Sequence, residues 1–253
     1  MIVVTSIPEL DLPRHGAVGL VPTMGALHEG HAALFRAARP ECDVLVASLF
    51  VNPAQFSEPS DLDAYPRNLD RDAAYAEARG VDVLFAPPAA EMYPAGFATW
   101  IEPAGAAAGL EADHRPAHFR GVATVCVKLF NLVRPETAWF GRKDAQQVAV
   151  LKQVVRDLNM PVEIRVVETV RDPDGLALSS RNERLSAAER EQALAIPRAL
   201  ATGDAAKARR VLAAAGLDPD YVTVADLDGP TLAVAVRVGG TRLIDNVLLK
   251  GAS

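Results

Sequence analysis

The chain has 253 residues, of which 50% are hydrophobic and 23% charged, the balance of a folded globular protein. The length allows one large domain or two smaller ones, and the apolar content excludes a disordered chain. Lysine and arginine number 26 and aspartate and glutamate 32, so a net charge of −6 gives no bulk attraction for nucleic acid.

Cysteine content and the absence of targeting segments indicate the compartment. Cys42 and Cys126 both stand in apolar surroundings, so we expect two buried thiols and no disulfide. The first residues show neither the basic region nor the cleavage site of a signal peptide. No apolar run reaches the roughly 18 residues of a membrane span. We expect a cytoplasmic protein without membrane or nucleic-acid partners.

Up to about residue 169, short apolar strands alternate with helices. Strands are predicted at residues 17–21, 43–50, 81–85, 137–140 and 162–167. Helices are predicted at residues 30–39, 69–79, 124–132 and 146–158. Such alternation is typical of an open α/β sheet with parallel strands.

The pattern changes after about Thr169. A helix is predicted over 186–199, because Ser186 and Glu189 form a capping-box sequence. A second helix is predicted at 205–215, and strands at 221–225, 231–238 and 241–249. We therefore predict two domains, an α/β domain over 1–169 and a smaller α+β domain over 170–253.

The most informative segment is VPTMGALHEGH, residues 21–31, which joins the first strand to the first helix. Gly25 and Gly30 let the backbone approach an anion closely. The helix N-terminus adds N–H groups and about half a positive charge. His28 and His31 add two directed donors, so the segment favours a bound phosphate.

Two other interpretations of the histidines remain open here. They could bind a metal, although their i, i+3 spacing differs from the i, i+4 spacing of a zinc helix and no third ligand is evident. They could also belong to a solvated turn without function. Neither GxxxxGK[ST] nor GxGxxG occurs, so a bound nucleotide would need another motif.

The segment FGRKDAQQ, residues 140–147, lies between a strand and a helix, where open α/β sheets bind ligands. Lys143 can meet a phosphate, and Asp144 can cap the helix or accept from a ribose. Gln146 and Gln147 point to different faces of the helix, so one can face a ligand and the other solvent. An ordinary charged first turn is the alternative.

Residues 170–182 offer two hydroxyls and a guanidinium group at Ser179, Ser180 and Arg181, a set that suits a polyphosphate. Gly175 is predicted to hinge this loop, so that residues 179–182 form a mobile lid. The alternative is a polar loop between domains.

The segment SLFVNPAQF, residues 48–56, places Asn52 and Gln55 after a strand, where amides can bind a small polar substrate. Residues 65–67 and 114–121 add polar and basic groups. For most of these additional residues, a structural turn with surface charge is the favoured interpretation.

The segments PTMGALHEGH, GRKDAQQ and LSSRN, in this order, resemble the pantoate–β-alanine ligase family. The first is similar to the HIGH signature of nucleotidylyl transferases and the third to their KMSKS loop. SLFVNPAQF, YPR and HFRGV fit as well, and the resemblance runs from about Val18 to Leu249.

The resemblance implies a Rossmann-like open parallel sheet of the HIGH-signature nucleotidylyl transferase type, with a C-terminal lid domain. It implies that pantoate reacts with ATP to give pantoyl adenylate and pyrophosphate, and that β-alanine then displaces AMP to give pantothenate. ATP would be handled as its Mg²⁺ complex. A homodimer is also implied.

The resemblance carries site residues over by position. His31, His28 and Lys143 would be catalytic. ATP would be bound by Pro22, Thr23, Met24, Gly25, His28, Gly30, His31, Gly141, Lys143, Asp144, Val170, Leu178, Ser179, Ser180 and Arg181. Pantoate and β-alanine would be bound by Asn52, Gln55 and Gln147, and Asp70 or Asp72 could hold Mg²⁺ if phosphates and water do not.

The sequence departs from the family pattern at three places. An N-terminal helix has only residues 7–16 available, including Pro8 and Pro13, so we expect it to be short or lost. The C-terminal part is short, and Arg142 replaces the usual glutamate beside Lys143.

Three other functions stay open at this point. A transferase with a phosphorylated acceptor would need cations where Gln55 and Gln147 stand. A fragment of an aminoacyl-tRNA synthetase is disfavoured by the acidic charge and by the lack of an anticodon-binding domain. A nucleotide sensor would be expected to have lost a histidine or Lys143.

Overall fold

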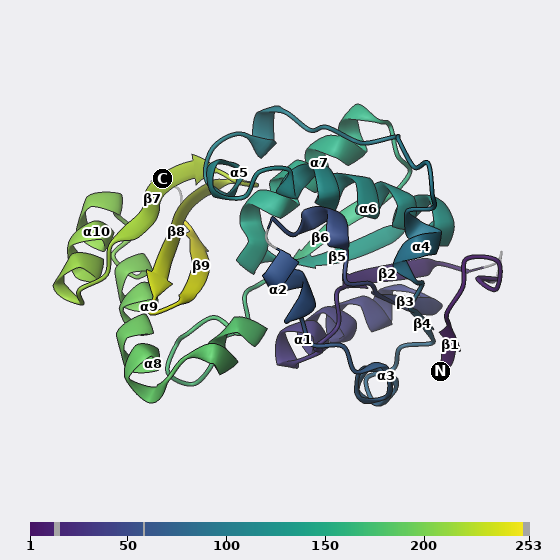
Figure 1. Ribbon diagram of the computed structural model, residues 1–253, viewed down its shortest axis with the longest axis horizontal. Helices are drawn as coiled ribbons and strands as arrows, with labels where there is room; N and C mark the ends of the chain where they lie inside the picture. Colours follow the sequence, from purple (N-terminus) through teal and green to yellow (C-terminus); the bar gives the residue numbers. More distant parts are fainter. Residues whose placement is uncertain (13–15, 58, 250–253) are drawn as a thin grey trace. The chain divides into compact units, whose positions relative to one another are not determined.

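The computed structural model describes residues 1–12, 16–57 and 59–249. The chain divides into two compact units (Figure 1). The first comprises Met1–Phe140 and Ala149–Val167, and the second Gly141–Val148 and Glu168–Ser253.

A six-stranded sheet forms the centre of the first unit. Its strands are β1 (Ile2–Val4), β2 (Val18–Thr23), β3 (Val44–Leu49), β4 (Val83–Phe85), β5 (Thr137–Gly141) and β6 (Glu163–Val167), in the order β1-β4-β3-β2-β5-β6. The pairs β1–β4, β4–β3, β3–β2 and β2–β5 are parallel. The chain runs from β2 outward to β4 on one side and then to β5 and β6 on the other. The strand order therefore reverses between β2 and β5, the position where such sheets bind ligands.

Helices cover both faces of this sheet, as Figure 1 shows. On one face lie α1 (Glu29–Ala38) and α3 (Leu69–Glu77), and on the other α6 (His118–Val133) and the later turns of α7 (Ala145–Asp157). Shorter helices are α2 (Pro59–Asp63), α4 (Ala89–Met92) and α5 (Glu111–His114). Because both faces are covered, the central strands are apolar along most of their length, and Leu20, Leu45 and Leu84 are fully buried.

The second unit packs three helices on an antiparallel sheet. The strands β7 (Pro219–Asp226), β8 (Pro230–Val238) and β9 (Thr241–Leu248) follow one another in space. The helices are α8 (Ala187–Ala193), α9 (Ala195–Leu200) and α10 (Ala205–Ala214). Alternate residues of β8, among them Leu232 and Val234, meet Ile196 and Leu212 in the core.

The predicted fold class is confirmed, with local differences. The helix predicted over 186–199 is two helices, because Pro197 cannot donate to the ladder of a continuous helix and its ring would clash with the preceding turn. The helix predicted over 124–132 begins earlier, at His118. Strand β1 was missed, since three residues carry too little pattern. In the described part of residues 7–16 there is no helix.

The burial of the two thiols agrees in part with the expectation from the sequence. Cys126 is buried, whereas Cys42 is half-buried, and both are free. Burial raises the pKa of the Cys126 thiol to about 12.

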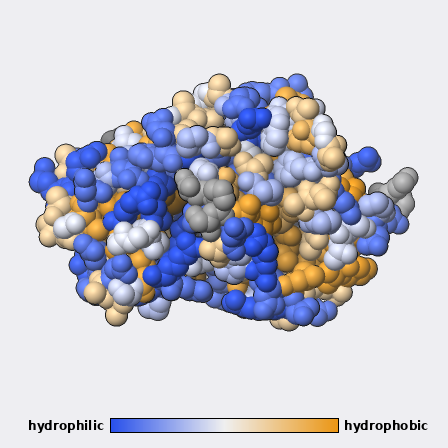
Figure 2. Space-filling view, viewed as in Figure 1, coloured by the Kyte–Doolittle hydropathy of each residue, from blue (hydrophilic) through white to orange (hydrophobic). Residues whose placement is uncertain are grey.

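Ile2 and Val3 of edge strand β1 are exposed, and Figure 2 shows hydrophobic side chains at this edge. None of the helices described is long and apolar enough to cross a membrane.

Close packing of α6 gives a test of the fold. A Cβ atom on Gly121 would collide with the carbonyl of Ala54 and lie 2.7 Å from the amide nitrogen of Gln55. We expect Gly121→Ala to lower the free energy of unfolding by about 1–3 kcal/mol in urea denaturation, the usual cost of overpacking. Gly240→Ala is the control, because its Cβ would meet nothing within 4 Å. Equal stability of the two variants would contradict this packing.

Candidate functional site

The turn between β2 and α1 is held by a buried carboxylate. Gly25 and Ala26 have positive φ values of 91° and 52°. Asp72 of α3 is 2% exposed and accepts from the amides of Ala26 and Leu27, at 2.9 Å each. Thr23 accepts from the amide of Gly25 and donates to Ser48 on β3. The turn is thus fixed from two neighbouring elements.

His28 and His31 form a reciprocal cap at the start of α1. Nδ1 of His28 accepts from the amide of Gly30 at 3.0 Å, and Nδ1 of His31 accepts from the amide of His28 at 3.2 Å. The ring centroids are 4.2 Å apart. An accepting Nδ1 carries no proton, so in each neutral ring the hydrogen is on Nε2. The cap therefore sets the tautomer in which Nε2 is the donor.

Gln55 lies in a buried polar network after β3. Its Oε1 accepts from Asn52 at 3.0 Å, and its Nε2 donates to the sulfur of Met24 at 3.2 Å. Its backbone carbonyl lies 3.1 Å from Nδ1 of His118. Since thioether sulfur is a weak acceptor, Gln55 Nε2 can exchange it for a substrate oxygen.

Asn52 is 1% exposed and its amide is saturated. Its Nδ2 donates to Gln55 and to the carbonyl of Gly121, and its Oδ1 accepts from Ala54 and Tyr93. Burial raises the pKa of the Tyr93 hydroxyl, which keeps it a donor. In this conformation Asn52 orients Gln55 and has no remaining bond for a ligand.

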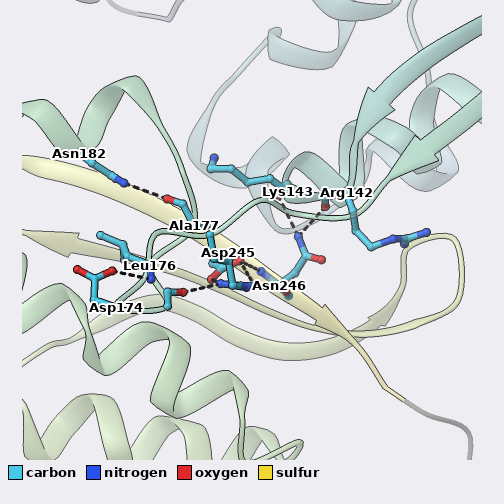
Figure 3. Close-up of polar contacts among 10 residues, drawn as sticks. Arg142, Lys143, Asp174, Leu176, Ala177, Asn182, Asp245 and Asn246 are labelled. Atoms are coloured by element: carbon cyan, nitrogen blue, oxygen red, sulfur yellow. Dashed lines mark hydrogen bonds and ion pairs between the residues drawn. The ribbon is translucent and has the colours of Figure 1, made fainter. Parts of the chain in front are cut away.

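The second unit carries the segment 141–148. Lys143 is half-buried, and no described residue forms a hydrogen bond or ion pair with its ammonium group. Figure 3 shows its side chain directed away from Asn246, which instead binds its carbonyl. Asp144 is exposed, Gln146 is buried, and Gln147 is partly exposed. Of the two glutamines, Gln147 is the more accessible.

Residues 170–178 form a closed turn rather than a hinge. The amide of Leu178 donates to Val170, and the amide of Gly175 to Asp172. Arg190 of α8 pairs with both Asp172 and Asp174, at 2.6 and 2.7 Å. Gly175 therefore lies inside the second unit rather than between the units, and the mobility predicted for residues 179–182 stays a prediction.

The residues predicted to bind a polyphosphate, Ser179, Ser180 and Arg181, follow this turn directly. Ser179 accepts from the amide of Arg181 and caps the short 3₁₀ helix Ser180–Arg184. Ser179, Ser180 and Arg181 are all partly exposed. The geometry brings them together in one turn of chain.

Arg142, the departure from the family pattern, is 8% exposed. It pairs with Asp228 at 3.1 Å and with Glu168 at 3.3 Å, both in the same unit. Sequence reasoning assigned it no partner. It also missed Arg171, Asp245 and Asn246, although the acidic and amide residues inside the apolar stretch LIDNVLL were a signal.

The carboxylates suggested for Mg²⁺ do not form a cation site. Asp72 is buried and its two oxygens accept from backbone amides, an arrangement that does not favour a metal ligand, and its suggested role with Mg²⁺ stays a prediction. Asp70 is exposed. Among the described residues, no group of three or more His, Cys, Asp or Glu side chains could hold a metal.

Comparison with known proteins identifies the family. The sequence model described as Pantoate-beta-alanine ligase matches residues 5–248. The pantothenate synthetase of Roseiflexus castenholzii is 50% identical, with 99% of this chain and 100% of the relative covered. That of Corynebacterium glutamicum is 51% identical, with 94% and 95% covered.

Solved structures agree over the whole chain. The pantothenate synthetase of Thermus thermophilus has a TM-score of 0.93 and 45% identity, with 99% of this chain and 100% of that one covered. The pantoate-beta-alanine ligase of Francisella tularensis, solved with beta-gamma ATP and beta-alanine, has a TM-score of 0.89 and 37% identity, with complete coverage of both chains.

The role of Asp72 in the turn is open to direct measurement. Asp72→Asn keeps the shape but turns an NH₂ group toward one backbone amide, so we expect a loss of about 1–3 kcal/mol in unfolding free energy. Hydrogen exchange at the amides of Ala26 and Leu27 should accelerate. Asp70→Asn, on the exposed side of the same helix, is the matched control. Unchanged exchange at both amides would show that the carboxylate does not hold the turn.

Proposed function

The chain belongs to the pantoate–β-alanine ligase family, and from this membership and the geometry above we propose that it makes pantothenate in two steps. The carboxylate of pantoate attacks the α-phosphorus of ATP, so that pantoyl adenylate forms and pyrophosphate leaves. The amine of β-alanine then attacks the acyl carbon, an amide bond forms, and AMP leaves with the electron pair of the broken bond.

The paired histidine cap at the start of α1 carries the proposal. A helix N-terminus attracts a phosphate, and two rings that carry their hydrogens on Nε2 add donors in the neutral state. Charge builds up on the phosphoryl oxygens during the first step, and such preorganised donors stabilise it. We assign this role to His28 and His31, with His31 as the proton donor.

Lys143 would supply the cation of the second unit, since its ammonium has no described partner. The proposed ATP-binding residues are Pro22, Thr23, Met24, Gly25, His28, Gly30, His31, Gly141, Lys143, Asp144, Val170, Leu178, Ser179, Ser180 and Arg181.

For the acyl and amine substrates we propose Gln55 and Gln147. The Nε2 donor of Gln55 now rests on a weak sulfur acceptor, and a carboxylate or hydroxyl oxygen would be a stronger one. Asn52 acts through Gln55, which it orients. The buried, uncharged amides also disfavour an acceptor that carries a phosphate.

The remaining parts of the proposal follow from the family resemblance. Residues 1–169 would bind the nucleotide and pantoate, and residues 170–253 would form a lid domain. Mg²⁺ would enter with ATP as part of the substrate complex, held by phosphates and water. The proposal also includes a homodimer and a cytoplasmic location.

The activity is tested by AMP release from ATP and Mg²⁺. We expect AMP with pantoate and β-alanine together, and none with β-alanine alone, because the amine has no activated acyl group to attack. Pantoate alone should give at most one pyrophosphate per protein chain. Multiple turnovers of AMP without β-alanine, or no AMP with both, would contradict the proposed reaction.

The roles of the donors are tested by single-turnover formation of pantoyl adenylate. We expect His31→Ala and Lys143→Ala each to slow it roughly 10²- to 10³-fold, the usual loss for one electrostatic donor. The controls are His114→Ala and Lys207→Ala, which remove the same side-chain types from exposed positions. Near-normal adenylation in either site variant, with a normal melting curve, would remove that residue from the mechanism.

A further inference from the structure

We propose that Asp245 and Asn246 of β9 are positioning residues for the ATP-binding segments of the second unit. Asn246 would hold the segment with Lys143, and Asp245 would hold the loop with Ser179–Arg181. The inference rests on the proposed function, because it takes the role of those segments from it. Figure 3 shows the contacts of Asn246 with Arg142 and Lys143.

Asn246 binds the backbone on which Lys143 stands. Its Nδ2 donates to the carbonyl of Arg142 and to that of Lys143, at 2.9 Å each. Asn246 is 5% exposed, and its bond to Arg142 is buried while that to Lys143 is partly buried. Two consecutive carbonyls bound to one amide fix the orientation of the peptide groups around Lys143. The Lys143 side chain then leaves the backbone in one direction.

Asp245 binds the base of the neighbouring loop. Both of its oxygens accept from Arg171, at 2.6 and 3.0 Å, in a bidentate pair. Arg171 in turn donates to the carbonyl of Gly175, and so spans the closed turn. Such bidentate pairs fix geometry as well as adding energy.

The loop beyond this turn is closed by one more contact. The side chain of Asn182 donates to the carbonyl of Ala177 at 2.9 Å. Ser179, Ser180 and Arg181 thus lie between two linked residues, Ala177 and Asn182. Since Ala177 pairs with Arg171 in a short β-bridge, the position of these three residues depends on Asp245.

The two anchors are neighbours in the chain, and their side chains point to opposite faces of the sheet, as those of successive strand residues do. Asp245 pairs with Val234 and shares its face with the core against the helices. Asn246 pairs with Ala233 on the other face, toward the turn at 142–144. One step along β9 therefore reaches both segments.

Stability of the sheet does not account for these two residues. Asp245 is 3% exposed, and burying a carboxylate is costly unless it is paired. Oδ1 of Asn246 is buried without a hydrogen-bond partner in the described structure, a further cost. Apolar side chains would pack at both positions, since Leu243, Ile244, Val247 and Leu248 on either side of the pair are apolar. The polar pair is explained by the segments that it holds.

The test uses Asn246→Leu and Asp245→Asn in the full chain. Asn246→Leu removes both donors at similar volume, and Asp245→Asn keeps the shape but removes the charge. We expect kcat/KM for ATP to fall roughly 10- to 100-fold, the scale of a displacement of about 1 Å. KM for β-alanine should stay within about twofold, because Asn246 holds residues 142 and 143 and Gln147, the residue of this segment proposed for the acyl and amine substrates, lies beyond them.

Hydrogen exchange gives a readout that is specific to each segment. Asn246→Leu should accelerate exchange at residues 141–144, and Asp245→Asn at residues 170–182, each leaving the other segment unchanged. Asp245→Glu should recover part of the kcat/KM for ATP that Asp245→Asn loses, since glutamate keeps the charge. Asp220→Asn is the control, because it removes an equally short ion pair with Arg242 from the same sheet.

The outcomes separate this inference from the proposed function. If the natural chain forms no AMP, the proposed function fails, and calorimetry with a nonhydrolysable ATP analogue then tests the anchors by affinity alone. The inference is overturned if both variants have the same kcat/KM for ATP, or the same affinity for the ATP analogue, as the control variant Asp220→Asn. It is also overturned if the kinetic constants for ATP, pantoate and β-alanine all change by the same factor and the melting temperature falls. That result would mark a general structural role for the two residues.

Discussion

The carboxylate of Asp72 determines the shape of the turn on which the proposed chemistry depends. It receives the amides of Ala26 and Leu27, in a stretch where the backbone takes positive φ values at Gly25 and Ala26. A non-glycine residue in this region is strained, so the surrounding structure must hold it. Once the turn is fixed, His28 stands at the N-cap of α1 and His31 one turn later. Their mutual cap then determines which ring nitrogen carries the hydrogen.

A buried polar side chain that holds neighbouring groups also occurs in the turn after β3 and in the second unit. Asn52 uses its whole amide to hold Gln55 and the turn after β3. Asn246 and Asp245 hold segments of the second unit in the same way. In each case a buried polar side chain satisfies backbone or partner groups that a helix or sheet would otherwise satisfy. Residues that would contact substrate are thereby separated from residues that hold them in place.

The same division separates the carboxylate that holds the turn from the imidazoles at the start of α1. The buried carboxylate of Asp72 is committed to backbone amides, and Asp70 of the same helix is exposed. An adenylation reaction needs an anion held firmly by donors, and in the proposed function helix α1 with its two histidines would supply them. The mixed anhydride then stores the energy of ATP for the amide bond, so positioning of the amine is the main requirement of the second step.

The sequence by itself determined the fold class, most element positions and the segments to which the proposed function assigns the ligands. Periodicity is local, and the segments 21–31, 140–147 and 170–182 are contiguous, so each could be recognised without coordinates. The tertiary structure decided what local pattern does not contain. Asp72 meets the turn 46 residues before it, Asn246 meets a carbonyl 103 residues before it, and Arg171 meets a carboxylate 74 residues after it. The break between α8 and α9 and the clamped turn around Gly175 likewise depend on packing and long-range pairs. A side chain that acts through a partner distant in sequence leaves no periodic signal, and only the folded chain shows what it holds.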